Sequence, residues 1–367
     1  MKTNRRSFLR DIFSCQKAST VVPYQSTPNN IGNGTTRMSV TERQENEAKI
    51  DGNDARRIRR ESVVSLGTEN LLADVNLNNA SNVYRMQVDV LWDKESPLLM
   101  NALQKSLLNN NNKNCLRILD VGCGTGELLA RLVGENGLFE KAIPAEMKLI
   151  LIGVELDRSV YEFCEKRCRK LKHRENTEIS IINGNATKLP FDSNSFDLIL
   201  NRHMLHCLPK HDIQLVINET WRILKMNSIV HFLVEDIEMI YTSVNNDQTL
   251  FEQYQLWSDG IYQTGAALGM DLRFGRKLPS ALIKSDFVLK SVDYVSVDTF
   301  RCHRPSLYNL FHLWYEMYVD AYKRNRLEFK YKKAFENFLH VVQDKNEYVC
   351  WNVPIIQAMK PTATTVQ

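Results

Sequence analysis

A short glycine-rich segment, residues 118–126, combines a carboxylate with a turn that could hold a ligand. It reads Ile-Leu-Asp-Val-Gly-Cys-Gly-Thr-Gly, with Asp120 at the end of an apolar run and glycine at every second position after it. Glycines let a turn bend sharply and let a ligand come close to backbone N–H groups. The residues from Gly126 to Val133 have a helical pattern, and the N-terminus of that helix would face the ligand. The segment alone leaves open a phosphate, a dinucleotide or another ligand.

The glycine spacing and Asp120 narrow this choice. A dinucleotide fingerprint has the spacing G-x-G-x-x-G, but here the third glycine, Gly126, comes one residue early and Glu127 takes its place. No Gly-Lys-Ser/Thr of a phosphate-binding loop follows. A pyrophosphate would also be repelled by Asp120. We therefore expect a ligand with a positive group, and S-adenosylmethionine, with its ammonium, sulfonium, ribose and adenine, fits.

The segment Asp120–Gly126 resembles the first motif of the class I SAM-dependent methyltransferases. The apolar run 149–155 ends in Glu155, which matches the family's acidic ribose ligand, because two vicinal hydroxyls can donate to one carboxylate. The gap of 29 residues between Gly126 and Glu155 exceeds the usual run of about 20. Residues 134–147, with their Gly, Asn and Pro, are interpreted as a surface insertion.

Three later segments resemble further motifs of the family in the same order. Residues 183–191 resemble the adenine-contact segment, in which Asn185 stands where aspartate is commoner and its amide oxygen could still accept a hydrogen bond; the alternative is a turn residue. Residues 192–201 resemble the fourth strand, and residues 221–227 the end of the helix before the fifth. The resemblance implies the following SAM-binding residues: Asp120, Gly122, Cys123, Gly124, Gly126, Glu155, Leu156, Asn185, Ala186 and Asn201.

A cluster of histidines follows the fourth predicted strand, where ligands of such sheets bind. His203 or His206 could accept a proton from a substrate hydroxyl or amine, and His206 is our candidate general base. The alternatives are packing against the cofactor and a zinc site that would include Cys207 and His211. Because nothing in the spacing guarantees convergent ligands, we expect no metal site.

Apolar strand patterns alternate with amphipathic helix patterns from residue 115 to about 240. Strands are predicted at 116–121, 149–155, 178–182, 196–200 and 228–234, and helices at 126–133, 159–173 and 213–224. This alternation predicts an α/β fold with a doubly wound, mostly parallel sheet. Further strands are expected near 288–297 and 348–359.

The predicted domain boundaries follow the composition. Residues 1–80 are polar, poor in apolar clusters and expected to be a disordered tail, and residues 81–367 are expected to form the methyltransferase domain. Helical segments that could form a lid or insertion are expected near 241–270 and 300–345. The predicted location is the cytoplasm or nucleus, with mitochondria as the alternative because residues 1–22 are basic and hold an apolar helix face.

The charge balance disfavours a domain-wide nucleic-acid surface. Residues 1–70 hold 12 Lys and Arg against 8 Asp and Glu, so 35 of each remain in the rest of the chain. A basic stretch at 323–333 is interpreted as the exposed face of a helix. The eight cysteines lack a C-x-x-C pair, which favours free thiols, and no apolar run is long enough to span a membrane.

The predicted function is methyl transfer from S-adenosylmethionine to an acceptor, with a small molecule favoured over a protein. The alternative from another class is a SAM-binding regulator without turnover, because the segment around Tyr84 and the general layout resemble methyltransferase-like regulators of fungal secondary metabolism. A nicotinamide dehydrogenase is disfavoured by the glycine spacing.

Overall fold

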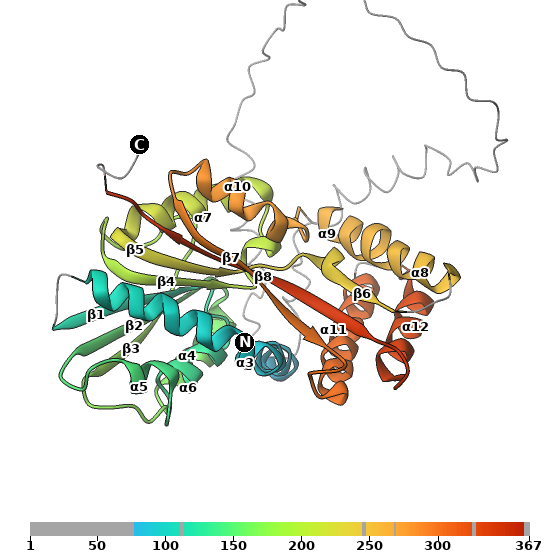
Figure 1. Ribbon diagram of the computed structural model, residues 1–367, viewed down its shortest axis with the longest axis horizontal. Helices are drawn as coiled ribbons and strands as arrows, with labels where there is room; N and C mark the ends of the chain where they lie inside the picture. The colour runs from blue at the N-terminus through green and yellow to red at the C-terminus, as the bar shows by residue number, and fades with distance from the viewer. Residues whose placement is uncertain (1–76, 111–113, 244–246, 268, 325–327, 363–367) are drawn as a thin grey trace, which may run out of the picture. The chain divides into compact units, whose positions relative to one another are not determined.

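The computed structural model describes residues 77–110, 114–243, 247–267, 269–324 and 328–362, all within the unit Asn70–Gln367 (Figure 1). The predicted polar tail lies, up to residue 76, outside the described residues. The predicted cellular location stays a prediction.

The described part of the chain is organised around one mixed sheet, in the order β3-β2-β1-β4-β5-β8-β6, with β7 paired to the other edge of β8. Five strands run parallel: β1 (Cys115–Val121), β2 (Lys148–Glu155), β3 (Thr177–Asn183), β4 (Phe196–Arg202) and β5 (Leu224–Leu233). The order reverses at β1, because β2 and β3 follow on one side of it and β4 and β5 on the other. Ligands of such sheets bind beyond the carboxyl ends of the strands at this switch point.

The remaining strands are antiparallel and extend the sheet beyond β5. Strand β8 (Val349–Met359) pairs with β5, with β6 (Ile240–Thr242) and, along most of its length, with β7 (Val288–Asp298). The strands expected near 288–297 and 348–359 are confirmed.

Helices cover both faces of the parallel strands, as a doubly wound fold requires. Because side chains alternate along a strand, Ile118 and Leu198 pack on one face while Leu119 and Ile199 pack on the other. The first face is covered by α3 (Leu77–Asn109), α4 (Glu127–Val133), α5 (Leu138–Ala142) and α6 (Arg158–Cys168). The second face is covered by α7 (Lys210–Ile223) and α10 (Leu278–Ile283). The predicted fold class is confirmed.

Helix α3 brings distant side chains to the sheet. It runs through Pro97 without ending, although an internal proline removes a hydrogen bond and strains a helix. Its fully buried residues Leu91, Leu99 and Leu103 pack into the core on both sides of the proline, which offsets that cost.

A separate helical group packs around β6 and one end of β7 and β8. It consists of α8 (Asp247–Tyr254), a π-helix (Gln255–Tyr262), α9 (Gln263–Ala267), α11 (Arg304–Arg324) and α12 (Lys332–Gln343). Figure 1 shows it on the far side of the molecule from β1, β2 and β3. Its core is aromatic, with edge-to-face contacts among Trp257, Phe311, Phe335 and Phe338. These helices fall in the two segments for which helical additions are predicted.

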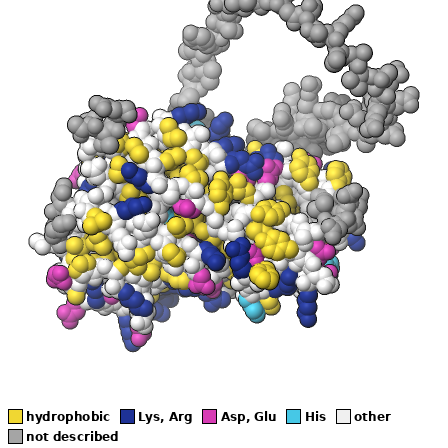
Figure 2. Space-filling model, viewed as in Figure 1, with side chains coloured by type: hydrophobic (Ala, Val, Ile, Leu, Met, Phe, Trp, Pro, Cys, Tyr) yellow, Lys and Arg dark blue, Asp and Glu magenta, His cyan; other side chains and the backbone are white. Residues whose placement is uncertain are grey.

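Two further observations concern the distribution of surface charge and the hydropathy of the helices. On the face shown in Figure 2, Lys and Arg side chains are scattered among acidic and apolar ones. Within the described ranges, no helix is both long enough and apolar enough to cross a membrane.

Candidate active site

The loop between β1 and α4 depends on its three glycines. Gly122, Gly124 and Gly126 have φ of 75°, 54° and 78°, the left-handed region that disfavours other residues. A Cβ at Gly122 would lie 2.8 Å from Cγ of Met204, and one at Gly126 would lie 2.8 Å from Sγ of Cys164. The glycines are therefore required both by the turn and by the side chains packed against it.

Four backbone N–H groups of this loop are bonded within the protein. Gly122 and Cys123 donate to the carbonyl oxygen of Val154 at 2.9 and 3.1 Å, and Gly126 donates to the carbonyl of Cys123 at 3.0 Å. Gly124 donates to a side-chain oxygen of Glu155 at 3.0 Å. A phosphate cradle needs free N–H groups, so this geometry agrees with the spacing argument against a dinucleotide.

Glu155 lies at the carboxyl end of β2, beside the loop that follows β1. Its second carboxylate oxygen accepts the N–H of Asp157 at 3.0 Å, and burial raises the pKa of the carboxyl despite these two N–H donors. Asn183, at the end of β3, holds this strand end because its amide donates to the carbonyls of Glu155 and Leu156 at 2.9 and 2.8 Å. Asn183 opens the predicted adenine-contact segment 183–191 but is not among the predicted cofactor residues, although its place at the end of the third strand is a usable signal.

Asp120, near the end of β1, is a buried carboxylate with a strongly raised pKa. It is 2% exposed, and burial raises its pKa to about 7, with Arg202 partly opposing this effect and Glu155 and Glu95 adding to it. Arg202 is itself bonded to both oxygens of Glu95 at 2.6 Å. Asp120 thus lies within the influence of two further carboxylates and one guanidinium, and a cationic ligand would balance the excess negative charge.

The other predicted cofactor residues differ in how they are placed. Asn201 is fully buried; its amide donates to the carbonyl of Val121 at 3.4 Å, and its Oδ1 has no partner among the described residues. Asn185 is exposed, and its Oδ1 accepts the N–H and the hydroxyl of Thr187, both at 2.9 Å. Asn185 thus forms the turn that the sequence left as the alternative, and its adenine contact, with that of Ala186, stays a prediction.

Behind the loop lies a group of three thiols. Sγ of Cys123 is 3.9 Å from Sγ of Cys164, which is 4.0 Å from Sγ of Cys168. Among the residues that the structure describes, no cluster of His, Cys, Asp and Glu is arranged to hold a metal ion.

A cavity of about 100 Å³ lies next to the loop. Tyr84 of α3 contacts both the cavity and the loop. Its side chain lines the cavity, and its ring lies 3.5 Å from the position that a Cβ of Gly124 would take. His203, His206 and Glu235 also line the cavity, from the segments that follow β4 and β5. His211, by contrast, is largely exposed on α7 beside Asp212.

The geometry favours His203 over the predicted base His206. The backbone N–H of Glu235 donates to Nδ1 of His206 at 3.3 Å, so the proton of a neutral ring is on Nε2. Burial lowers the pKa of His206 to about 4. His206 therefore has no free nitrogen lone pair to offer near neutral pH. The sequence analysis gives His203 as the other candidate base, but it does not predict that Glu235 lies beside it.

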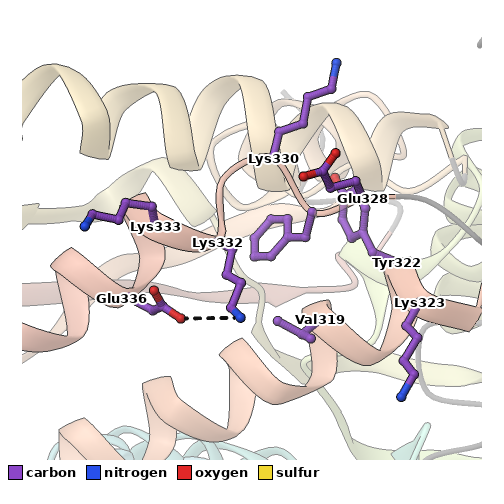
Figure 3. A pocket seen from close by; sticks show the side chains of 9 residues that line it. Val319, Tyr322, Lys323, Glu328, Lys330, Lys332, Lys333 and Glu336 are labelled. Atoms are coloured by element: carbon purple, nitrogen blue, oxygen red, sulfur yellow. Dashed lines mark ion pairs between the residues drawn. The ribbon is translucent and has the colours of Figure 1, made fainter.

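A second, larger cavity of about 490 Å³ lies between α11 and the start of α12, over the predicted basic stretch (Figure 3). Lys323, Lys330 and Lys333 point in different directions, and Lys332 pairs with Glu336 at 3.8 Å. The lysines do not converge on one point, which agrees with their interpretation as a solvated face.

A parallel sheet with a glycine turn after β1 and an acidic residue at the end of β2 is an arrangement typical of α/β domains that bind nucleoside cofactors. Residues 119–232 match the family model of the methyltransferase domain. Over these residues the chain is similar to the class I SAM-dependent methyltransferases.

Curated relatives match this part of the chain. A ubiquinone/menaquinone biosynthesis C-methyltransferase of Rhizobium rhizogenes is 25% identical over 170 residues, 45% of this chain and 57% of that protein. A demethylmenaquinone methyltransferase of Lactococcus lactis is 32% identical over 113 residues, 30% of this chain and 38% of that protein. The chain thus spans about half the length of the curated relatives it matches, or less.

Solved structures are similar at a lower sequence identity. The geranyl diphosphate C-methyltransferase of Streptomyces coelicolor, in complex with S-adenosyl-L-homocysteine, is 17% identical with a TM-score of 0.41, over 74% of this chain and 79% of that chain. The [4+2]-cyclase SpnF is 17% identical with a TM-score of 0.42, over 72% of this chain and 82% of that chain.

Proposed function

We propose that the protein transfers a methyl group from S-adenosylmethionine to a small-molecule acceptor. The observation that carries this proposal is the placement of two carboxylates, Asp120 and Glu155, beside one glycine loop at the carboxyl ends of adjacent strands. Burial raises the pKa of both carboxyl groups and so disfavours their ionised forms. A cationic, hydroxyl-bearing ligand would stabilise the ionised forms, which is the arrangement expected at a binding site.

The residues present fit the cofactor. Asp120 would hold the ammonium group, Glu155 would accept hydrogen bonds from the ribose hydroxyls, and the unpartnered Oδ1 of Asn201 would accept one more. The cofactor supplies an electrophilic methyl group on a positively charged sulfur. The protein's part is to bind and align the two reactants and to exclude water.

Two observations support a small molecule as acceptor. The cavity that Tyr84 connects to the loop has room for a ring-sized group and is lined mainly by apolar and aromatic side chains. One curated relative is named as a C-methyltransferase of ubiquinone/menaquinone biosynthesis and another as a demethylmenaquinone methyltransferase.

Calorimetry on the full chain tests the cofactor site. Asp120→Ala and Glu155→Ala should each abolish measurable binding of S-adenosylhomocysteine. Glu162→Ala, which removes an exposed carboxylate on α6 paired with Arg158, is the matched control and should bind as the wild type does. Unchanged binding in both site variants would disprove the assignment.

A second assay separates an enzyme from a regulator. The protein is incubated with methyl-labelled S-adenosylmethionine and a small-molecule extract of cells, and label is measured in extractable products. Labelled product supports the enzyme. Tight cofactor binding with no labelled product would favour the SAM-binding regulator, and tight binding of NAD would favour the dehydrogenase.

A further inference from the structure

A histidine–carboxylate pair stands at the cavity. Nδ1 of His203 lies 2.8 Å from Oε1 of Glu235, and their side chains are 12% and 7% exposed. The two atoms are in ion-pair contact, but they are not aligned for a hydrogen bond. The indole N–H of Trp351 donates to the other oxygen of Glu235 at 3.2 Å and fixes the carboxylate. Burial alone would raise the pKa of Glu235, but His203 lowers it below its ordinary value. The pair therefore joins an ionised carboxylate to one nitrogen of the ring.

This arrangement leaves the other ring nitrogen of His203 free. With a proton on Nδ1 facing the carboxylate, Nε2 carries a lone pair. Like Nδ1, that nitrogen is buried and has no aligned hydrogen-bond partner among the described residues, and the ring lines the cavity. His203 also has φ of 51°, a conformation that costs energy in a residue other than glycine and that clusters at functional sites.

The cavity selects against anions. Its described lining contains no Lys or Arg. Arg273, which follows the lining residue Leu272, is committed elsewhere because it pairs with Glu238 and lies 3.5 Å above the ring of Tyr262. The apolar part of the lining consists of Val83, Ile237, Met270, Leu272, Trp314 and Met317. An ionised Glu235 and a described lining without Lys or Arg make this space unfavourable for a carboxylate or phosphate.

We infer, resting on the proposed methyl transfer, that His203 is the general base, that Glu235 positions it, and that the acceptor is a neutral, largely apolar molecule with a phenolic or enolic hydroxyl. The proton of that hydroxyl passes to Nε2 of His203 while the oxygen lone pair forms the new bond to the methyl carbon. The electron pair of the broken carbon–sulfur bond stays on sulfur, which becomes a neutral thioether. The proton on His203 is then released to solvent.

The pKa of a base limits which hydroxyl groups it can deprotonate. An ordinary imidazole has a pKa near 6.5 and a phenol near 10, a gap of about 3.5 units. An aliphatic hydroxyl resembles water, with a pKa near 16, so its gap is roughly 9 units. General-base catalysis by a histidine is effective only where this gap is small, so a phenol or enol is a suitable acceptor and an alcohol is not.

Three probes of similar size test the acceptor class on the full chain. They are 4-methylphenol, benzyl alcohol and 4-hydroxybenzoate, offered with labelled S-adenosylmethionine. We expect methyl transfer to 4-methylphenol and at least tenfold slower transfer to the other two, since one lacks an acidic hydroxyl and the other carries a charge. Binding of S-adenosylhomocysteine is measured first.

Two variants test the base. Asparagine tolerates positive φ, so His203→Asn keeps the backbone while removing the base, and turnover of 4-methylphenol should fall by about 10² to 10⁴. Glu235→Gln keeps an acceptor for Trp351 and should lower kcat while KM for 4-methylphenol stays within about twofold, which a merely structural role would not produce. His211→Asn, on exposed α7, is the matched control and should leave turnover unchanged.

The outcomes separate this inference from the proposed function. Failure to bind S-adenosylhomocysteine would overturn the proposed function itself. Normal binding with no methylation of 4-methylphenol, with equal use of the other two probes, or with full turnover by His203→Asn, would overturn this inference and leave the cofactor site intact.

Discussion

The affinity of the protein for S-adenosylhomocysteine is expected to fall as the pH is lowered through 7. The reason is Asp120, whose pKa burial raises to about 7, and whose ionised form would pair with the ligand's ammonium group. When the carboxyl is protonated that attraction is lost, so binding requires removal of a proton from the free protein. S-adenosylhomocysteine is a suitable probe because it carries the ammonium group without a reactive methyl.

The magnitude follows from one titrating group. For a pKa of about 7 the apparent Kd rises by the factor 1 + 10^(7 − pH), which is about 1.3 at pH 7.5 and about 33 at pH 5.5. The affinity should thus weaken about 25-fold over this range, or about 2 kcal/mol.

The assay is calorimetry at constant ionic strength between pH 5.5 and 8.5, with Asp120→Asn as the comparison. The variant cannot ionise at this position, so it should bind weakly with little pH dependence and approach the wild type at pH 5.5. A wild-type affinity that is flat from pH 5.5 to 7.5, or a variant with the same slope, would refute the reasoning. A slope steeper than one proton would indicate that Glu155, whose pKa burial also raises, titrates with Asp120, and Glu155→Gln would then restore the single step.

Three further substitutions test the packing around the site by chemical denaturation. Arg202→Met leaves Glu95 buried without its cation and should cost about 3–5 kcal/mol of unfolding free energy; a loss below 1 kcal/mol would contradict the role of the pair. Gly126→Ala should cost at least about 1–2 kcal/mol for its φ of 78°, together with most of the cofactor affinity, and an affinity equal to that of the wild type would show that the loop relaxes. Phe338→Ala, in the aromatic core between α11 and α12, should cost about 3–5 kcal/mol without changing the Kd of S-adenosylhomocysteine, and a changed Kd would link that core to the site.

The parallel strands could be predicted because their signals are local. Apolar runs end at Asp120 and Glu155, and strand pairing brings their carboxyl ends to one edge of the sheet. The predictions differ from the structure where contacts with other strands or helices determine an element's boundary or burial. The predicted helix 213–224 ends at Ile223, because β5 begins at Leu224, opposite Phe196 of β4. In the predicted surface insertion 134–147, Phe139 of α5 is fully buried against the sheet.

The charge network could not be predicted, because its members are far apart in the chain. Glu95 lies 107 residues before Arg202, and its position facing the sheet depends on a helix that continues up to and past Pro97. Tyr84 reaches the glycine loop from the same helix. No motif encodes these contacts, since each follows from how α3 packs across the sheet and not from the spacing of residues along the chain.

The end of β4 explains how one strand can serve a cofactor, a charge network and an acceptor. Side chains alternate along a strand, so Arg202 faces α3 and Glu95 whereas Asn201 points to the opposite face, where its Oδ1 is free of partners among the described residues. A regular strand would turn the next side chain back to the face of Asn201. His203 instead adopts φ of 51°, ends the strand and places its ring beside Glu235 in the cavity. The left-handed conformation of His203 thus directs the proposed base into the cavity, away from the face where Asn201 would contact the cofactor. We therefore infer the role of His203 from its backbone conformation and not from a sequence motif.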